Sequence, residues 1–308
     1  MLMRAVESYL AVRRAAGYKL DASGSMLRHF ARFAMDKGEC FIRCETAIEW
    51  AGEGPSPGQR ARRLQIVNYL ARYLHAEDPR HEIPSRSVFV YKRQRPTPFI
   101  YAQADIVRLV HEAARLEPAR SEPADSSLPL TFSTLLSLLA STGLRTREAM
   151  VLCLDDVTSE GLLIRETKFR KSRLVPLHDS AVVGLQRYLG RRRRFSTSDD
   201  HVFVSPWGRA LKYGYVRKKF RQVVKQAGLE SSPGQPCPQL HSFRHTFAVR
   251  ALQACPDDRD RIGQHMLALS TYLGHARVTD TYWYLQAVPE LMVDIAHASE
   301  NFVKGEMS

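Results

Sequence analysis

The sequence lacks the features that mark membrane, secreted and metal-binding proteins. No apolar run approaches the ~18–20 residues of a membrane-spanning helix. Segment 1–17 carries arginines and no apolar block, which argues against a secretory signal. The five cysteines are odd in number and form no C-x-x-C or Cys/His pair, so neither a disulfide framework nor a metal site is expected. We expect a cytoplasmic protein without metal, cofactor or membrane contact.

Acidic residues are in the minority. The 308 residues hold 45 Lys+Arg against 32 Asp+Glu, which gives a net charge of +13. The excess is densest in residues 1–98 and comes mainly from arginine, whose planar fork binds phosphate oxygens in pairs. A sequence pI near 9.7 is typical of nucleic-acid-binding proteins. Arginine-rich codon usage in a GC-rich genome would explain the same excess equally well.

Apolar periodicity predicts a helical domain over residues 1–90. Leu27, Phe30, Ala31 and Ala34 follow helical spacing and end before Gly38. Thr46 and Glu49 have the spacing of a capping box at the head of a short helix. A further helix spans 64–74, and basic side chains accompany it: Arg60, Arg62, Arg63 and Arg72. Residues 91–98, rich in proline and basic residues, are predicted to be a linker.

Residues 99–308 form the second predicted domain. An apolar helix over 130–139 ends before Gly143, and helical patterns return at 180–194 and from 241 onward. Between them, apolar segments 162–164 and 174–177 flank a basic stretch and predict a hairpin with a cationic tip. The expected fold is mainly α-helical with a small antiparallel β-sheet.

Chemistry-bearing residues lie in four separated segments. Thr142-Gly143-Leu144-Arg145 places an arginine where one helix ends and the next begins, a position suited to binding an anion. Lys168 lies at the hairpin tip. His241 and Arg244 are three residues apart on one helix face. Leu273-Gly274-His275 is followed nine residues later by Tyr284. Each fragment alone is more often structural than catalytic.

In this order and spacing, the four segments resemble the tyrosine recombinase (integrase) family. The resemblance covers the catalytic domain, and the helical first domain is more loosely similar to the family's core-binding domain. It implies a C-shaped clamp around double-stranded DNA, a tetramer on DNA with a monomer in solution left open, and related recombinases of the same element as further partners. Integration, excision or transposition of a mobile element is the implied role in a bacterial cytoplasm, at the nucleoid when bound to DNA.

The resemblance also implies roles for individual residues. Arg145 and Arg244 would hold the scissile phosphate, and Tyr284 would attack it to give a 3′-phosphotyrosine and a free 5′-hydroxyl. His241 would accept the tyrosine proton, Lys168 would protonate the leaving oxygen, and His275 would donate a hydrogen bond to the phosphate. Glu148 would orient Arg145. The expected DNA-binding residues are Arg60, Arg62, Arg63, Lys92, Arg93, Arg95 and Lys171.

Several alternatives stay open at this point. Tyr282 lies two residues before Tyr284, and only the spacing from His275 favours the latter. Lys171 competes with Lys168. A type IB topoisomerase shares the chemistry, Xer-type resolution of chromosome dimers shares the family, and a DNA-binding accessory protein would have lost catalysis. The complete set of six reactive residues argues against the last of these.

Overall fold

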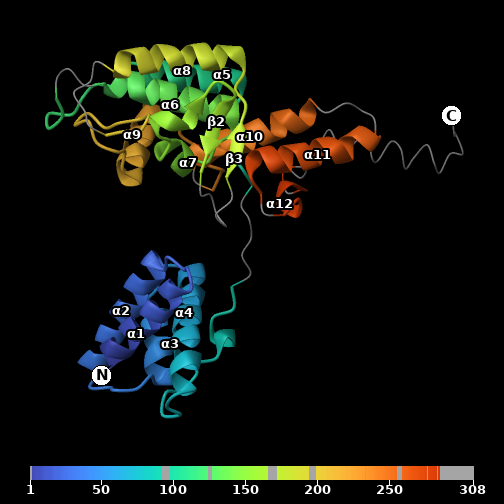
Figure 1. The fold of residues 1–308 in the computed structure, drawn as a ribbon. Helices are drawn as coiled ribbons and strands as arrows, with labels where there is room; N and C mark the ends of the chain where they lie inside the picture. Colours follow the sequence, from blue (N-terminus) through green and yellow to red (C-terminus); the bar gives the residue numbers. More distant parts are fainter. Residues whose placement is uncertain are drawn as a thin grey trace, which may run out of the picture. The chain divides into compact units, whose positions relative to one another are not determined.

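The computed structural model describes residues 2–91, 97–123, 127–165, 172–193, 199–232, 234–254, 259–275, 277–282 and 284, with the backbone alone at 259–262 and 282. The chain divides into two compact units, Met1–Arg95 and Pro96–Ser308 (Figure 1).

The first unit is a helical bundle. Its elements are α1 (Leu2–Ala15), α2 (Asp21–Asp36), α3 (Cys44–Gly52), α4 (Pro57–His75) and the 3-10 turn η1 (Arg86–Val88). The periodicity predicted for α2 is confirmed, because the four predicted apolar positions, Leu27, Phe30, Ala31 and Ala34, are buried. The rings of Phe30 and Trp50 lie 5.3 Å apart in the centre of this core.

The predicted capping box at Thr46 is wrong. Helix α3 begins two residues earlier, at Cys44, and its N-cap residue Arg43 makes no side-chain cap bond. The Thr46 hydroxyl donates instead to Glu39. The amide at the start of the helix is satisfied from a distant loop, since Cys44 N donates to Glu82 Oε2 at 2.7 Å. A carboxylate 38 residues away thus takes the place of a local cap.

The second unit surrounds the apolar helix α6. Phe132, Leu135, Leu136 and Leu139 of α6 are fully buried. The elements in chain order are α5 (Gln103–Ala113), α6 (Leu128–Thr142), α7 (Thr146–Met150), η2 (Leu154–Asp156), β1 (Val157–Thr158), β2 (Gly161–Ile164), β3 (Arg173–Val175), α8 (Asp179–Arg192), α9 (Tyr213–Gln226), α10 (Leu240–Gln253), α11 (Arg259–Leu273) and α12 (Thr279–Tyr282). The predicted class, mainly α with a small antiparallel sheet, is confirmed (Figure 1).

The sheet is a three-stranded antiparallel meander in the order β1-β2-β3. Leu163 pairs with Leu174, and Ile164 pairs with Arg173, so the hairpin predicted from the apolar segments is present. Its second strand covers Arg173–Val175 rather than 174–177. Arg173 therefore belongs to the strand and not to the basic tip.

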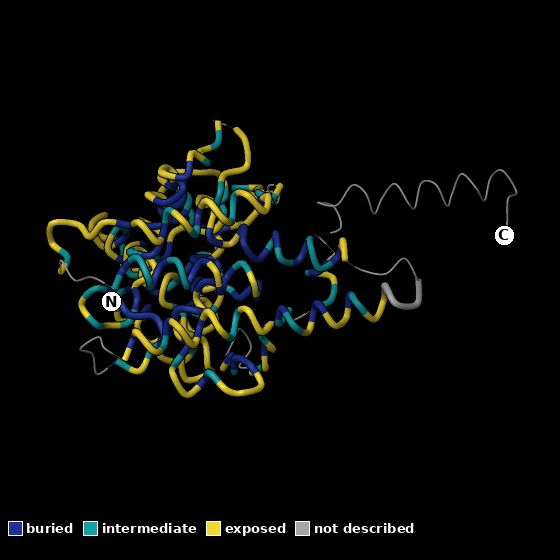
Figure 2. The backbone as a smooth tube through the Cα atoms, turned by 90° about the horizontal axis from the view of Figure 1, so that it is seen from above, coloured by how far each residue is buried: buried dark blue, intermediate teal, exposed yellow. Residues whose placement is uncertain are grey.

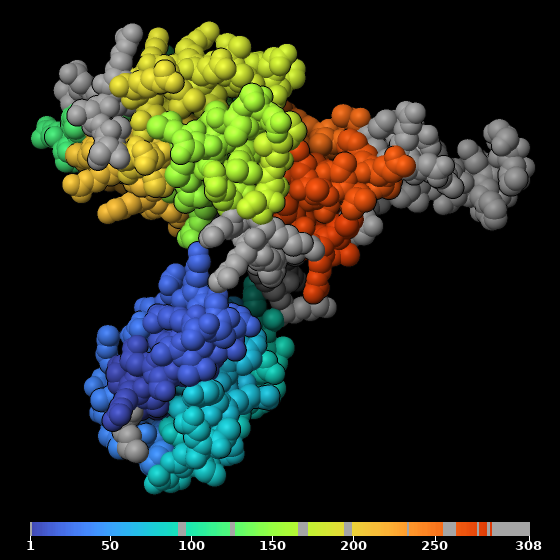
Figure 3. Space-filling view, viewed as in Figure 1, coloured from blue at the N-terminus to red at the C-terminus, as the bar shows by residue number. Residues whose placement is uncertain are grey.

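A second apolar cluster joins α10, α11 and the segment after α12. It contains Ala248, Val249, Leu252, Met266, Leu269, Leu273 and Tyr284. Figure 2 colours buried positions such as these dark blue, between intermediate and exposed ones. Helix α11 also contacts strand β3, and Figure 3 shows the yellow-green sheet region against the orange-red of α11. Elements from both halves of this unit thus meet at the end of α11.

Candidate active site

A sharp turn between α6 and α7 positions Arg145. Gly143 follows α6 with a left-handed φ of +60°, and a Cβ there would lie 2.6 Å from the Phe247 ring. Glycine is required at this position on both counts. The turn makes Arg145 the N-cap of α7. Its side chain is 31% exposed, so Arg145 is only partly covered by the protein.

The Glu148 carboxylate holds two arginines at once. Oε1 accepts from Arg145 Nη1 at 2.7 Å and from Arg173 Nη1 at 3.2 Å. Oε2 accepts from the Arg145 amide at 3.0 Å and from Arg173 Nη2 at 2.8 Å. Burial alone would raise the pKa of Glu148, but the hydrogen bonds and charge of Arg173 and Arg145 outweigh burial and lower it. Glu148 is therefore a charged group in contact with Arg145, as an orienting role requires.

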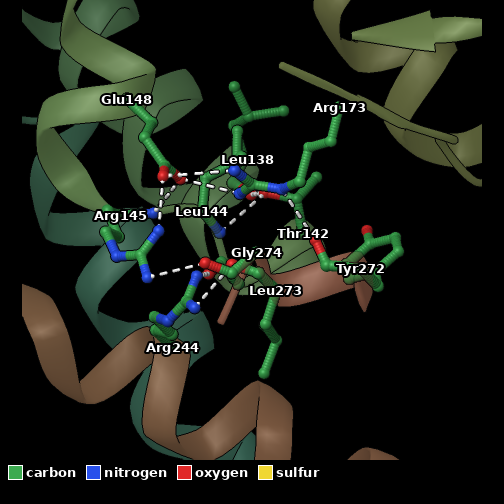
Figure 4. Close-up of polar contacts among 11 residues, drawn as sticks. Leu138, Thr142, Leu144, Arg145, Glu148, Arg173, Arg244, Tyr272, Leu273 and Gly274 are labelled. Carbon is green, nitrogen blue, oxygen red and sulfur yellow. Dashed lines mark hydrogen bonds and ion pairs between the residues drawn. The ribbon is translucent and has the colours of Figure 1, made fainter. Parts of the chain in front are cut away.

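Three arginines donate to three consecutive carbonyls at the end of α11 (Figure 4). Arg173 Nε donates to Tyr272 O at 2.8 Å, Arg244 Nη2 to Leu273 O at 2.7 Å, and Arg145 Nη2 to Gly274 O at 3.1 Å. The last carbonyls of a helix have no partner within the helix and carry its negative end. The arginines satisfy them and fix the turn that leads into His275.

Arg244 is the most deeply buried of the three. Only 1% of the residue is exposed, and its Nη1 donates to Gly143 O at 3.0 Å. Burial, followed by the nearby charge of Arg145, lowers its pKa to about 10. Within the described ranges, no ion pair joins Arg244 to a carboxylate, whereas Arg145 and Arg173 share Glu148. A buried positive charge without an ion-paired carboxylate in the described part of the chain is suited to an anionic ligand.

Three histidines next to the arginines are neutral at about pH 7. Burial is the main cause in each case, and it lowers the pKa of His241 to about 4, of His245 to about 3 and of His275 to about 4. The nearby positive charge of Arg244 lowers all three further. A neutral imidazole carries a nitrogen lone pair, which the proton-accepting role predicted for His241 requires.

Tyr284 lies among these histidines. Tyr284 is 3% exposed, and its ring centroid lies 5.5 Å from that of His245. The Tyr284 ring is stacked on the His275 ring, with a centroid distance of 6.0 Å. The His275 ring is held in turn by Thr281, whose Oγ1 is 2.7 Å from Nδ1. His241 joins the group through His245, at a centroid distance of 4.5 Å. The structure thus brings together five of the predicted site residues: Arg145, His241, Arg244, His275 and Tyr284.

We expect the second unit to lose stability as the pH falls from about 6.5 to about 4. His241, His245 and His275 titrate near 6.5 in the unfolded chain, while their folded pKa values are lowered to about 4, about 3 and about 4. The unfolded chain therefore binds protons first, and by about pH 5 each histidine costs up to about 2 kcal/mol of folding free energy. Thermal unfolding across this range measures the effect. His245→Gln should flatten the pH dependence, and an equally steep dependence in that variant would contradict the burial argument.

Other predicted residues lie outside the described part of the chain. Lys168 and Lys171 fall in the connection between β2 and β3, and Lys92, Arg93 and Arg95 are among the last residues of the Met1–Arg95 unit. Their roles stay predictions. Tyr282 is described by its backbone alone, so its side chain cannot be compared with that of Tyr284.

Two of the three predicted DNA-binding arginines on α4 have protein partners. Arg60 Nε donates to Gly54 O at 2.9 Å, and Arg63 Nη1 donates to Trp50 O at 3.0 Å while its guanidinium lies over the Trp50 ring. Arg63 thereby satisfies a carbonyl in the last turn of α3, and Arg60 one in the turn that follows this helix. Arg62 is exposed. DNA contact by these arginines stays a prediction.

Arg173 and His245 are site residues that the sequence patterns did not predict. Arg173 was assigned to the basic hairpin tip, yet it reaches Glu148 and the end of α11. The feature of the sequence that could have indicated Arg173 is its position directly before the apolar residues of β3. His245 was visible only as the neighbour of Arg244, and its ring contacts both His241 and Tyr284.

No group of three or more His, Cys, Asp or Glu residues within the described ranges could hold a metal ion. In the same part of the chain, no helix is long and apolar enough to cross a membrane.

Comparison with known proteins decides the family. Residues 102–290, more than half of the chain, match the model of the phage integrase family. The chain belongs to the phage integrase family. The predicted tyrosine recombinase family is therefore confirmed, and the chain is a tyrosine-type recombinase.

Relatives of this phage integrase family member extend over both units. It is 37% identical over 297 residues to the protein named integrase/recombinase y4rB of Sinorhizobium fredii, covering 94% of each chain. It is 28% identical over 290 residues to the tyrosine recombinase XerD of Brucella abortus, covering 92% of this chain and 87% of XerD.

Solved structures of low sequence identity share the fold of this phage integrase family member. The XerH recombinase in a post-cleavage complex with its difH substrate has a TM-score of 0.66 at 19% identity and matches 91% of this chain and 80% of its own. A lambda integrase tetramer bound to a Holliday junction has a TM-score of 0.66 at 14% identity and matches 92% of this chain and 76% of its own.

Proposed function

We propose that this recombinase cleaves and rejoins DNA at specific sites with Tyr284 as its nucleophile. The Tyr284 Oη attacks the phosphorus, the bond from phosphorus to the 5′ oxygen breaks, and a 3′-phosphotyrosyl linkage forms. His241 accepts the phenol proton, and Lys168 delivers a proton to the leaving 5′ oxygen. Attack by a 5′-hydroxyl from another strand reverses the step. The phosphodiester energy is retained, so the chemistry needs no ATP.

The observation that carries this proposal is the buried charge of Arg244, which forms no ion pair with any described residue, beside Arg145 and Tyr284. Arg244 has only carbonyl partners at its described contacts, and it lies close enough to Arg145 and Tyr284 to interact electrostatically with both. A phosphate is an anion that two guanidinium groups can hold in place. As the pentacoordinate state gains charge, the same groups stabilise it, which makes them the main source of rate enhancement.

Covalent capture tests the reaction. The wild-type chain is expressed in bacteria and purified under denaturing conditions, and the DNA that stays attached is sequenced. A duplex nicked a few nucleotides beyond the cleavage point of the recovered site should then trap a stable adduct in vitro. The short fragment that carries the new 5′ end diffuses away, so it cannot attack the phosphotyrosine. The released fragment should carry a 5′-hydroxyl that polynucleotide kinase labels. A 5′-phosphate on that fragment, or no adduct on any recovered site, would contradict the proposal.

We expect Lys168→Ala to slow adduct formation by about 10²- to 10⁴-fold on ordinary DNA, the usual range for losing a general acid. A duplex with sulfur in place of the bridging 5′ oxygen should restore most of the rate, because a thiolate leaves without a proton. The measurement is the single-turnover cleavage rate on both duplexes. Lys171→Ala is the matched control and should cleave both at similar rates. Rescue of Lys171→Ala rather than Lys168→Ala would reverse the assignment.

The assembly on DNA is proposed to be a tetramer acting on two duplexes. The lambda integrase structure of similar fold is a tetramer bound to a Holliday junction. In the Met1–Arg95 unit, the exposed Arg62 would contribute to DNA contact, whereas Arg63 and Arg60 already donate to carbonyls at and just after the end of α3.

Integration, excision or transposition of a mobile element is the proposed biological role. It is supported by the 37% identity to a protein named integrase/recombinase. Xer-type resolution is the second candidate, supported by the identity to XerD. The sequenced covalent DNA separates the two, since attachment at the ends of an element supports the first and attachment at a single chromosomal site supports the second.

A further inference from the structure

We infer that Arg173 is a positioning residue for cleavage: it ties Glu148 to the last turn of α11, so that Arg145 and His275 meet the same phosphate. The inference rests on the proposed function, and it adds a residue outside the six that carry the chemistry.

All three guanidinium nitrogens of Arg173 are used within the protein. Nη1 and Nη2 donate to the two oxygens of Glu148 at 3.2 and 2.8 Å, and Nε donates to Tyr272 O at 2.8 Å. The side chain is 11% exposed and its charge is compensated by a carboxylate. Arg244, by contrast, forms no ion pair with a carboxylate within the described ranges. Arg173 is therefore built to hold protein groups and not to bind a phosphate.

The two groups that Arg173 joins each control a site residue. Glu148 accepts from both the backbone and the guanidinium of Arg145 and so sets where that guanidinium lies. Tyr272 O belongs to the turn of α11 that leads through Gly274 into His275. The hydrogen bonds of Arg173 thus connect strand β3 to helix α7 and to the end of α11 (Figure 4).

The Arg173 guanidinium packs directly against Gly274. Its φ is +68°, and a Cβ at this position would lie 2.8 Å from Arg173 Nη1. A side chain there would displace the Arg173 guanidinium as well as strain the turn. The glycine of the Leu273-Gly274-His275 motif thus leaves the space that Arg173 occupies.

Arg173→Met tests the inference through a pH profile. The single-turnover cleavage rate on saturating duplex should fall by about 100-fold, the cost of misplacing reacting groups, while the affinity for DNA stays close to that of the wild type. The acid limb of the rate should also move to higher pH. Among the groups that lower the pKa of Glu148 against burial, Arg173 contributes most, so that pKa should be higher in Arg173→Met than in the wild type. Glu148 is then protonated, and releases Arg145, at a higher pH.

Matched variants separate positioning from folding. Arg192 is a buried arginine of the same unit that donates to the carbonyls of His201 and Val202. Arg192→Met should lower thermal stability and leave the acid limb where it is in the wild type. In the Glu148→Gln background, adding Arg173→Met should cost far less than in the wild type, because the two side chains act as one unit.

Two results would overturn the inference. One is wild-type cleavage by Arg173→Met; the other is slow cleavage with an acid limb that has not moved, as expected for Arg192→Met. If Arg173→Met does not fold, Arg173→Lys is the second variant: it keeps the charge but not the separated donors of the fork, so cleavage should still slow, and a wild-type rate in Arg173→Lys would contradict the inference. Absence of an adduct with the wild-type chain would refute the proposed function itself, and is thereby distinct from either result.

Discussion

Tyr284→Phe is expected to abolish the covalent DNA adduct while leaving the fold and DNA binding intact. The substitution removes a single oxygen, the nucleophile, and no other group in the proposed mechanism can replace it. The phenyl ring keeps the packing of Tyr284 against His275 and His245 and its place in the α10–α11 cluster. Adduct on the nicked duplex, measured by denaturing gel after incubation with excess protein, should fall below detection.

Tyr282→Phe is the matched control for this result. It alters the neighbouring tyrosine by the same single atom and should leave adduct formation close to that of the wild type. An adduct that persists in Tyr284→Phe and disappears in Tyr282→Phe would overturn the assignment. If both variants unfold normally and lose the adduct equally, both tyrosines are needed for cleavage, and the nucleophile is not identified by this pair alone.

Arg145→Lys should slow cleavage by about 10²- to 10³-fold, the cost of removing one donor that stabilises a charged transition state. Arg145 uses one nitrogen for Glu148 and another for Gly274 O. A lysine ammonium is a point charge and cannot hold the carboxylate, the carbonyl and a phosphate oxygen in one plane. The loss should appear in the single-turnover rate at saturating DNA.

Arg147→Lys is the comparison for Arg145→Lys. Arg147 is exposed two residues further along the same short helix, and its guanidinium lies over the Tyr213 ring. It keeps its charge when replaced by lysine and should cleave at nearly the wild-type rate. Similar losses in both variants would mean that α7 tolerates no change, and the argument from the guanidinium fork would fail.

Much of the fold could be predicted because local patterns decide it. The apolar spacing of α2 and α6 matches their buried faces, and the two apolar segments around the basic stretch pair as a hairpin. The order and spacing of the motifs also predicted the family correctly. Local patterns failed where a distant residue competes with a local one, as at α3, where Glu82 satisfies the helix start that Thr46 was expected to cap.

The residues that hold the site residues in place could not be predicted, because their partners are also distant in the sequence. Arg173 contacts Glu148 across 25 residues and Tyr272 across 99, and nothing in its immediate neighbours distinguishes it from the other basic residues of the hairpin. Likewise, Arg60 and Arg63 carry the same charge as Arg62, yet the carbonyls at and just after the end of α3 decide which of them are already engaged. Such roles depend on tertiary partners and become visible only in three dimensions.

The most direct test of the account is the identity of the amino acid that carries the DNA. After trapping the wild-type chain on its nicked duplex, nuclease and protease digestion followed by mass spectrometry locates the residual nucleotide on a peptide. The account predicts a 3′-phosphotyrosyl nucleotide on Tyr284. A nucleotide found on Tyr282, on any other residue, or joined through a 5′-phosphate would contradict it.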